Sequence, residues 1–139
     1  MLQNNRAYLS HSIRGKLGVN ATPESMAANN GEAHEAAVLM RAILPEVHIY
    51  VPGEHDEVIS LLYQGGRLKE EDILWADCQL IKHTCQILIA YSPDGYISTG
   101  MMVEIKFARN HNIPVYIVAG ADDLAAIKSE ILEYLSGKK

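Results

Sequence analysis

The chain has little of several features that mark particular classes of protein. Among its 139 residues it carries two cysteines, Cys78 and Cys85, whose spacing fits neither a disulfide framework nor a paired-cysteine zinc site. We therefore predict that both are reduced thiols in the core. No apolar run approaches the length that spans a bilayer, and the N-terminus has no basic region followed by a hydrophobic stretch. These absences favour a cytoplasmic protein without a membrane partner.

Positive charge is also scarce. Lys and Arg total 12 against 17 Asp and Glu, which gives a formal net charge of −5. The basic residues are scattered and form no stripe along which a nucleic-acid backbone could bind with release of its counterions. A polynucleotide partner is therefore not expected.

Nucleotide and metal motifs are missing as well. A P-loop that ends at Gly15-Lys16 would need glycine at position 10, where this chain has Ser10. No GxGxxG dinucleotide fingerprint occurs. Val38 occupies the position where a zinc-protease motif starting at His34 would carry its second histidine. We expect neither a metal nor an organic cofactor.

What is present is an alternation of strand and helix patterns over residues 1–139. Runs of β-branched and aromatic residues predict strands at Ala7–Ser10, Val47–Pro52, Gln86–Tyr91 and Pro114–Gly120. Apolar periodicity predicts helices at Thr22–Pro45, Glu54–Tyr63, Lys69–Lys82, Gly100–Asn110 and Asp122–Leu135. This order predicts a single α/β domain: an open parallel sheet, Rossmann-like or flavodoxin-like, with helices on both faces.

The first predicted helix has a clear start and a weak middle. Thr22 is expected to cap it, with Pro23 at the first helical position and Pro45 as the stop. The sequence Asn29-Asn30-Gly31 is expected to divide it into two pieces.

Ligands of such sheets bind beyond the carboxyl ends of the strands, where the strand order reverses. Three segments satisfy this condition: the turn after Tyr8, the loop after Val51, and the sequence "SPDGYISTG" after Tyr91. The candidate site is therefore expected where these segments meet.

One carboxylate, Asp77, lies in the apolar stripe of its helix, four residues from Ile73 and Ile81. A carboxylate in that position either bonds to a nearby loop backbone or lines a cavity. Glu104 likewise projects inward, beside Met101. The helix macrodipole favours its ionised form, and an ionised carboxylate at a cleft can act as a nucleophile.

The two carboxylates belong to helices that flank the predicted strand Gln86–Tyr91, which places both near the end of that strand. Paired carboxylates are typical of enzymes that cleave a bond at the anomeric carbon of a sugar, because a negative oxygen stabilises the positive charge that develops there.

The sequence "YLSHSIRG" (Tyr8–Gly15) and the span Asp72–Val118 resemble the nucleoside 2-deoxyribosyltransferase superfamily, and within it the branch that cleaves nucleoside monophosphates. The resemblance implies that Glu104 is the nucleophile that attacks C1′, that Tyr8 positions it, and that Asp77 assists departure of the base. The residues that it implies for binding the 5′-phosphate and sugar are Ser12, Ile13, Arg14, Gly15, Ser98 and Gly100.

Some of these residues also have simpler explanations, and others depart from the family. Ser98 could be only the cap of its helix, and Arg14 only a surface charge. His11 stands where the family usually has a small residue, and Met102 where it often has glycine. We take these two as candidates for the base pocket. Since the family often shares its active site between subunits, the resemblance also implies a homodimer or higher homo-oligomer.

The leading hypothesis is an enzyme that hydrolyses the N-glycosidic bond of a (deoxy)nucleoside 5′-monophosphate to a free base and a sugar 5-phosphate. The hydroxyl of Ser98 suits a phosphate better than the acidic residue that nucleoside-using members tend to have there. Two alternatives stay open: a transferase that exchanges bases through the same glycosyl-enzyme, and a non-catalytic module that binds or senses a nucleotide.

Overall fold

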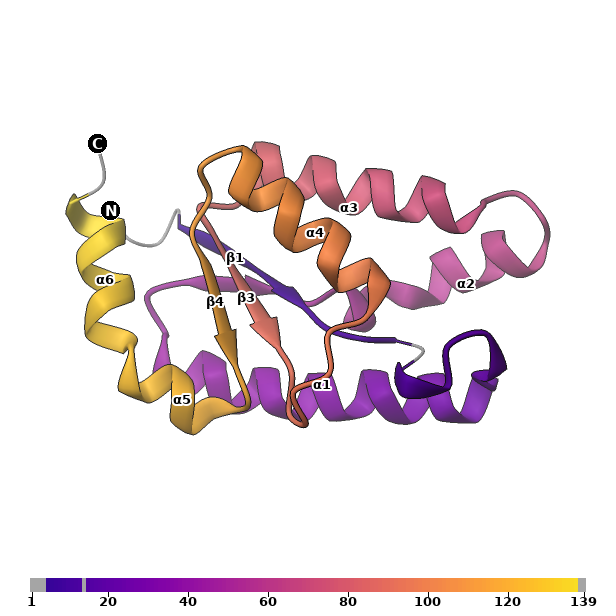
Figure 1. Cartoon of the computed structure of the whole chain (residues 1–139), viewed down its shortest axis with the longest axis horizontal. Helices are drawn as coiled ribbons and strands as arrows, with labels where there is room; N and C mark the ends of the chain where they lie inside the picture. The colour runs from indigo at the N-terminus through magenta and orange to yellow at the C-terminus, as the bar shows by residue number, and fades with distance from the viewer. Residues whose placement is uncertain (1–4, 14, 138–139) are drawn as a thin grey trace.

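The computed structural model describes residues 5–13 and 15–137, and its centre is a parallel sheet of four strands (Figure 1). The strands are β1 (Arg6–Ser10), β2 (His48–Tyr50), β3 (Ile87–Tyr91) and β4 (Val115–Val118), in the order β2-β1-β3-β4. Tyr8 of β1 pairs with Tyr50 on one side and Leu88 on the other. The predicted open parallel α/β sheet is therefore confirmed.

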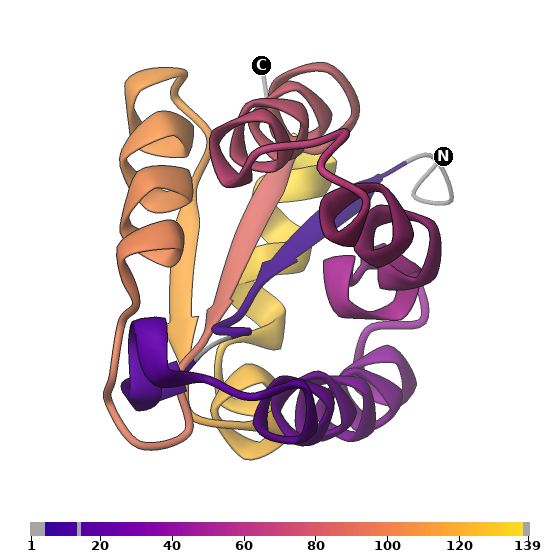
Figure 2. The same cartoon turned by 90° about the vertical axis from the view of Figure 1, so that its right-hand side faces the viewer.

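Helices cover both faces of the sheet. They are α1 (Pro23–Ile43), α2 (Asp56–Gln64), α3 (Glu70–Thr84), α4 (Thr99–Asn110), α5 (Ala121–Ala126) and α6 (Lys128–Gly137), with short 3-10 helices at Gly15–Asn20 and Pro52–His55. In Figures 1 and 2, α3 lies on one side of the sheet and α1 on the other. No helix in the described part of the chain is both long and apolar enough to cross a membrane.

The start of α1 confirms one prediction, and its middle overturns another. Thr22 caps the helix: its hydroxyl accepts from the amide of Ser25 at 3.0 Å, and the Ser25 hydroxyl accepts from the amide of Thr22 at 2.9 Å. The expected division at residues 29–31 is wrong, because α1 runs without a break from Pro23 to Ile43. Its later turns bury Ala33, Ala37 and Met40, and this packing outweighs the weak local preference.

Two other predicted helices are divided. The pattern at Glu54–Tyr63 becomes the 3-10 helix Pro52–His55 followed by α2. The pattern at Asp122–Leu135 becomes α5 and α6, which Ile127 separates with non-ideal helical dihedrals of φ −110° and ψ 11°.

Alternation along the strands creates two cores. Ala7 and Leu9 of β1 pack toward α1, whereas Tyr8 packs toward α3 and α4 with Leu88 of β3 and Met101 of α4. Cys78 and Cys85 are both free and buried, as predicted.

The strand order defines a switch point. From β1 the chain passes through α1 to β2 on one side, and from β3 it passes through α4 to β4 on the other. The carboxyl ends of β1 and β3 therefore lie side by side where the direction of winding reverses, which is where ligands bind in open parallel sheets.

Candidate active site

Glu104 of α4 lies buried against β1, with 6% of its surface exposed. Tyr8 donates a hydrogen bond from its hydroxyl to Glu104 Oε2 at 2.8 Å, and Ser10 donates one to Oε1 at 2.7 Å. Tyr8 and Ser10 are two residues apart on a strand, so their side chains leave the same face. Both oxygens of the carboxyl group are thus held by hydroxyl donors from one strand.

Asp77 of α3 completes this cluster from the neighbouring helix. Burial raises the pKa of Asp77 above its usual value, and hydrogen bonding to Tyr8 and Glu104 opposes that rise. The Asp77 carboxyl group therefore lies near Tyr8 and Glu104. Both carboxyl groups point inward, as their spacing in the sequence predicted.

The balance of charge in the cluster differs from the sequence-based expectation. Burial raises the pKa of Glu104 above its usual value, and the charge of Asp77 adds to this, whereas the hydrogen bonds from Ser10 and Tyr8 lower it. The net direction is upward, so burial outweighs the helix macrodipole that favours ionisation. Because the pKa values of Asp77 and Glu104 are both raised, the pair retains a proton at pH values where an isolated carboxyl group would be ionised.

Two further groups belong to the surroundings of the pair. Burial and the charges of Glu104 and Asp77 raise the pKa of Tyr8 well above its usual value, so the phenol stays a hydrogen-bond donor. Burial and the same two charges raise the pKa of the Cys78 thiol to about 11, which keeps it neutral.

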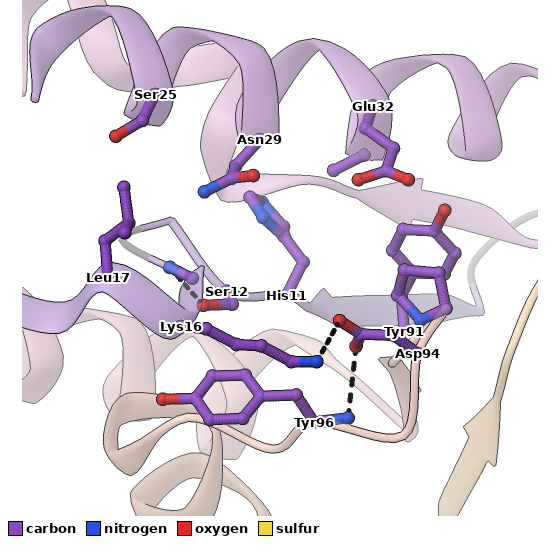
Figure 3. A pocket seen from close by; sticks show the side chains of 13 residues that line it. His11, Ser12, Lys16, Leu17, Ser25, Asn29, Glu32, Tyr91, Asp94 and Tyr96 are labelled. Atoms are coloured by element: carbon purple, nitrogen blue, oxygen red, sulfur yellow. Dashed lines mark hydrogen bonds and ion pairs between the residues drawn. The ribbon is translucent and has the colours of Figure 1, made fainter. Parts of the chain in front are cut away.

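A cavity of about 240 Å³ opens beyond the carboxyl ends of β1 and β3 (Figure 3). Three segments line it: the turn after β1, the first half of α1, and the loop after β3. Two of the three segments that the sequence placed at the ligand-binding edge therefore meet around one hollow. The lining residues from these segments include His11, Ser12, Gly15, Asn29, Glu32, Asp94 and Tyr96.

The turn after β1 is held in shape by its own hydroxyl and by α1. Ser12 Oγ accepts from the amide of Gly15 at 2.8 Å, and the side-chain amide of Asn29 donates to the carbonyl of Ile13 at 2.8 Å. Gly15 has φ 66°, a left-handed conformation that favours glycine, and a Cβ there would lie 2.9 Å from Asn29 Nδ2, so the Asn29 side chain would have to move. Arg14 lies outside the described residues.

The charges around the cavity are of both signs. Lys16 Nζ lies 3.1 Å from Asp94 Oδ2, and Glu32 of α1 also faces the cavity (Figure 3). The backbone N–H of Tyr96, followed by Lys16, lowers the pKa of Asp94. In the described part of the lining, the acidic side chains thus outnumber the lysine.

His11 connects the cavity to the third predicted segment, the loop after β2. Its Nε2 accepts from the amide of Gly53 at 3.2 Å, and the ring is 8% exposed. A Cβ on Gly53 would lie 2.9 Å from His11 Cε1 and 2.8 Å from Asn30 Oδ1. The large residue at position 11 is therefore accommodated by a glycine in the facing loop.

The remaining predicted residues lie at the start of α4. Ser98 caps this helix, accepting from the amide of Met101 at 3.2 Å, which is the simpler of its two interpretations. A Cβ on Gly100 would meet only Leu74 Cδ2, at an ordinary 3.7 Å. Met102 is 40% exposed. None of Ser98, Gly100 and Met102 is among the described residues that line the cavity.

The structure therefore divides the predicted site residues into groups. It brings Tyr8, Asp77 and Glu104 together, and it places His11, Ser12 and Gly15 around the cavity.

Ser10 was missed as a partner of Glu104, and so were Asn29 and Glu32 as lining residues. The alternation of β1 puts Ser10 on the same face as Tyr8, and this pattern could have indicated it.

Comparison of the chain with family models, with curated proteins and with solved structures finds no match. The family resemblance therefore stays a prediction that depends on the residues quoted for it. The function must be argued from the cluster and the cavity themselves.

Proposed function

We propose that the protein hydrolyses the N-glycosidic bond of a (deoxy)nucleoside 5′-monophosphate, releasing the base and a sugar 5-phosphate. The observation that carries this proposal is the buried Glu104 carboxyl group, held at both oxygens by Tyr8 and Ser10 and coupled to Asp77. Buried carboxyl pairs with perturbed pKa values are the equipment of glycosidic cleavage.

The proposed reaction uses the proton that the two carboxyl groups share. Glu104 passes its proton to Asp77 and attacks C1′, so a C1′–oxygen bond forms as the C1′–nitrogen bond breaks. The electron pair of the broken bond stays on the base nitrogen, and the base leaves with the proton from Asp77. Water then attacks C1′ as the C1′–oxygen bond to Glu104 breaks, and the electron pair of that bond stays on the Glu104 carboxylate. The water gives one proton to the pair, which frees the sugar phosphate and restores the starting state.

In this proposal, the cavity beyond β1 and β3 receives the sugar phosphate. Ligand sites commonly measure roughly 300–1,000 Å³, so about 240 Å³ suits part of a nucleotide better than the whole of it. The Ser12 hydroxyl and Lys16 at its rim offer hydrogen bonds and positive charge to a phosphate.

A panel of nucleoside monophosphates tests the proposal, with released base measured by chromatography. We expect release from at least one member, loss of release in Glu104→Gln, and a large reduction in Asp77→Asn. The matched control is Glu130→Gln on the exposed surface of α6, which should act like the parent. No release from any monophosphate by the parent protein would refute the proposal.

A second candidate is base exchange on unphosphorylated nucleosides through the same glycosyl-enzyme. Glu32 and Asp94 favour it, because negative charge around the cavity repels a phosphate dianion. Supplying a nucleoside with a second free base distinguishes the two reactions: a new nucleoside indicates transfer, and a free sugar indicates hydrolysis.

A non-catalytic nucleotide-binding module is the third candidate, and calorimetry would reveal it as tight binding without turnover.

We also propose that the protein acts in the cytoplasm as a homodimer. Exposed apolar side chains gather where α3 meets α4, with Trp75 67% exposed and Val103 40% exposed beside a groove that Leu74 and Phe107 also line. Light scattering should give twice the monomer mass, and Trp75→Ser should reduce it toward the monomer.

A further inference from the structure

Ser10, at the end of β1, has a buried hydroxyl on a face that is otherwise mostly apolar. The residue is 0% exposed, and its neighbour in register on β3 is Ala90. Leu88, Met101 and Ile105 pack on the same face. A hydroxyl buried in such surroundings needs a partner, and here the partner is Glu104 Oε1 at 2.7 Å.

The hydrogen bond from Ser10 differs in effect from that of Tyr8 because it reaches the other oxygen. The last torsion of a glutamate side chain is broad, so one hydrogen bond leaves the carboxyl group free to swing about the bonded oxygen. A second donor on the opposite oxygen removes that freedom. Tyr8 and Ser10 together therefore fix the plane of the Glu104 carboxyl group.

We propose that Ser10 is a positioning residue for Glu104, locking the orientation of its carboxyl group. This inference rests on the proposed function, in which Glu104 is the nucleophile. Preorganisation of this kind matters because a misplaced reacting atom costs rate even when substrate still binds.

The groups that face Glu104 show why the Ser10 hydroxyl has a large influence on its carboxyl group. From β1 these are Tyr8 and Ser10, and from α3 they are Asp77 and Cys78. In the described part of the chain, no lysine, arginine or histidine is among the groups that shift the pKa of Glu104. Of the influences that lower this pKa, the hydrogen bond from Ser10 is the largest.

The test is Ser10→Ala, which removes the hydroxyl oxygen and leaves the rest of the side chain unchanged. We expect the Glu104 carboxyl resonance, followed by carbon NMR in glutamate-labelled protein and assigned with Glu104→Gln, to titrate at higher pH than in the parent. In turnover assays, kcat should fall about 10- to 100-fold, which is the effect of one hydrogen bond to a charged group. KM should change less than about twofold.

Two variants control this experiment. Ser10→Cys keeps a weak donor of similar size, so its titration and kcat should lie between those of Ser10→Ala and the parent. Thr84→Val removes a hydroxyl that donates to the Leu80 carbonyl at 2.7 Å on α3, and it should leave both readouts unchanged.

The outcomes separate this inference from the proposed function. An unchanged Glu104 titration in folded Ser10→Ala overturns the inference, whatever the turnover. A parent protein that releases no base overturns the proposed function, and the NMR titration then still decides whether Ser10 holds and tunes Glu104. Equal effects of Ser10→Ala and Thr84→Val on kcat would also count against a positioning role.

Discussion

Two glutamates in different regions of the molecule show how a carboxylate reveals its role. Glu54, after β2, accepts from Arg41 Nη1 and Nη2 of α1 at 2.9 and 2.7 Å. These hydrogen bonds lower the pKa of Glu54 to about 2. Glu104 accepts from the neutral hydroxyls of Tyr8 and Ser10, and burial raises its pKa. Glu54 is therefore stabilised as an ion, whereas Glu104 is held where ionisation is costly.

The difference lies in what each carboxylate does for the fold. Arg41 also donates to the Ile49 carbonyl at 2.8 Å, so the Arg41–Glu54 pair ties α1 to the loop that follows β2. Glu104 has hydrogen bonds, but no cation of the described residues is among the groups that shift its pKa, and the charge of Asp77 raises that pKa further. This arrangement makes ionisation of Glu104 unfavourable, and perturbed pKa values of this kind cluster at functional sites, which is why we propose a catalytic role for Glu104 and not for Glu54.

The largest expected effect comes from Glu104→Gln. The amide keeps the shape of the side chain but cannot attack C1′, so base release should fall at least about a thousandfold. Chromatography of released base under saturating substrate measures it. Glu54→Gln, the matched change in the other region, should reduce release less than about threefold. A similar loss in both variants would remove the distinction between the two glutamates.

The second effect is on stability as a function of pH, and it has opposite signs at the two sites. Because the pKa of Glu104 is raised, its contribution to the free energy of unfolding is complete at low pH. That contribution is lost as the pH rises above the usual carboxyl pKa of about 4. The lowered pKa of Glu54 means that its contribution is present at neutral pH and is lost as the pH falls toward about 2.

Urea unfolding at a series of pH values measures both contributions. In Glu104→Gln, the decline toward alkaline pH should shrink by an amount on the order of 1–3 kcal/mol, because the buried group no longer ionises. In Glu54→Gln, the decline toward acid pH should shrink instead. A slope between about pH 4 and pH 8 that is the same in Glu104→Gln and in the parent would show that Glu104 ionises without cost.

A smaller effect is expected from removing the Arg41–Glu54 ion pair. Arg41→Met removes the cation but keeps much of the side-chain length. Since both partners are partly exposed, the free energy of unfolding at pH 7 should fall by on the order of 1 kcal/mol. Urea unfolding checks this, with Arg109→Met on the exposed side of α4 as the control. An unchanged value would show that solvent screens the pair completely.

The smallest effects are expected around the cavity, where charges face solvent. Lys16→Ala should raise KM for a nucleoside monophosphate about threefold, and Glu32→Gln should lower it by a similar factor, because each changes one screened charge. Steady-state kinetics at low ionic strength measure both. If KM falls in Lys16→Ala, the cavity does not receive the phosphate.

Much of the fold could be predicted because its elements depend on local patterns. The β-branched runs located all four strands, and Thr22 with Pro23 located the start of α1. The continuity of α1 through Asn29-Asn30-Gly31 could not be predicted, since the buried face after Gly31 supplies the energy that the local residues lack.

The candidate site was partly predictable for the same reason. The helical spacing around Asp77 and Glu104 indicated that both carboxylates point inward. That spacing could not show their protonation, because a pKa depends on burial and on neighbours from other elements. Burial and the charge of Asp77 raise the pKa of Glu104 and so oppose the ionisation that the macrodipole favours.

The sequence by itself determined which segments form strands and helices, and that two acidic side chains interrupt apolar helix faces. These features follow from periodicities within a few residues of the chain. Only the tertiary structure decided that Ser10 meets Glu104, which is 94 residues away, and that the turn after β1 closes a cavity with α1 and the loop after β3. Such contacts arise when the parallel sheet brings distant segments to one edge, and no local pattern records that meeting.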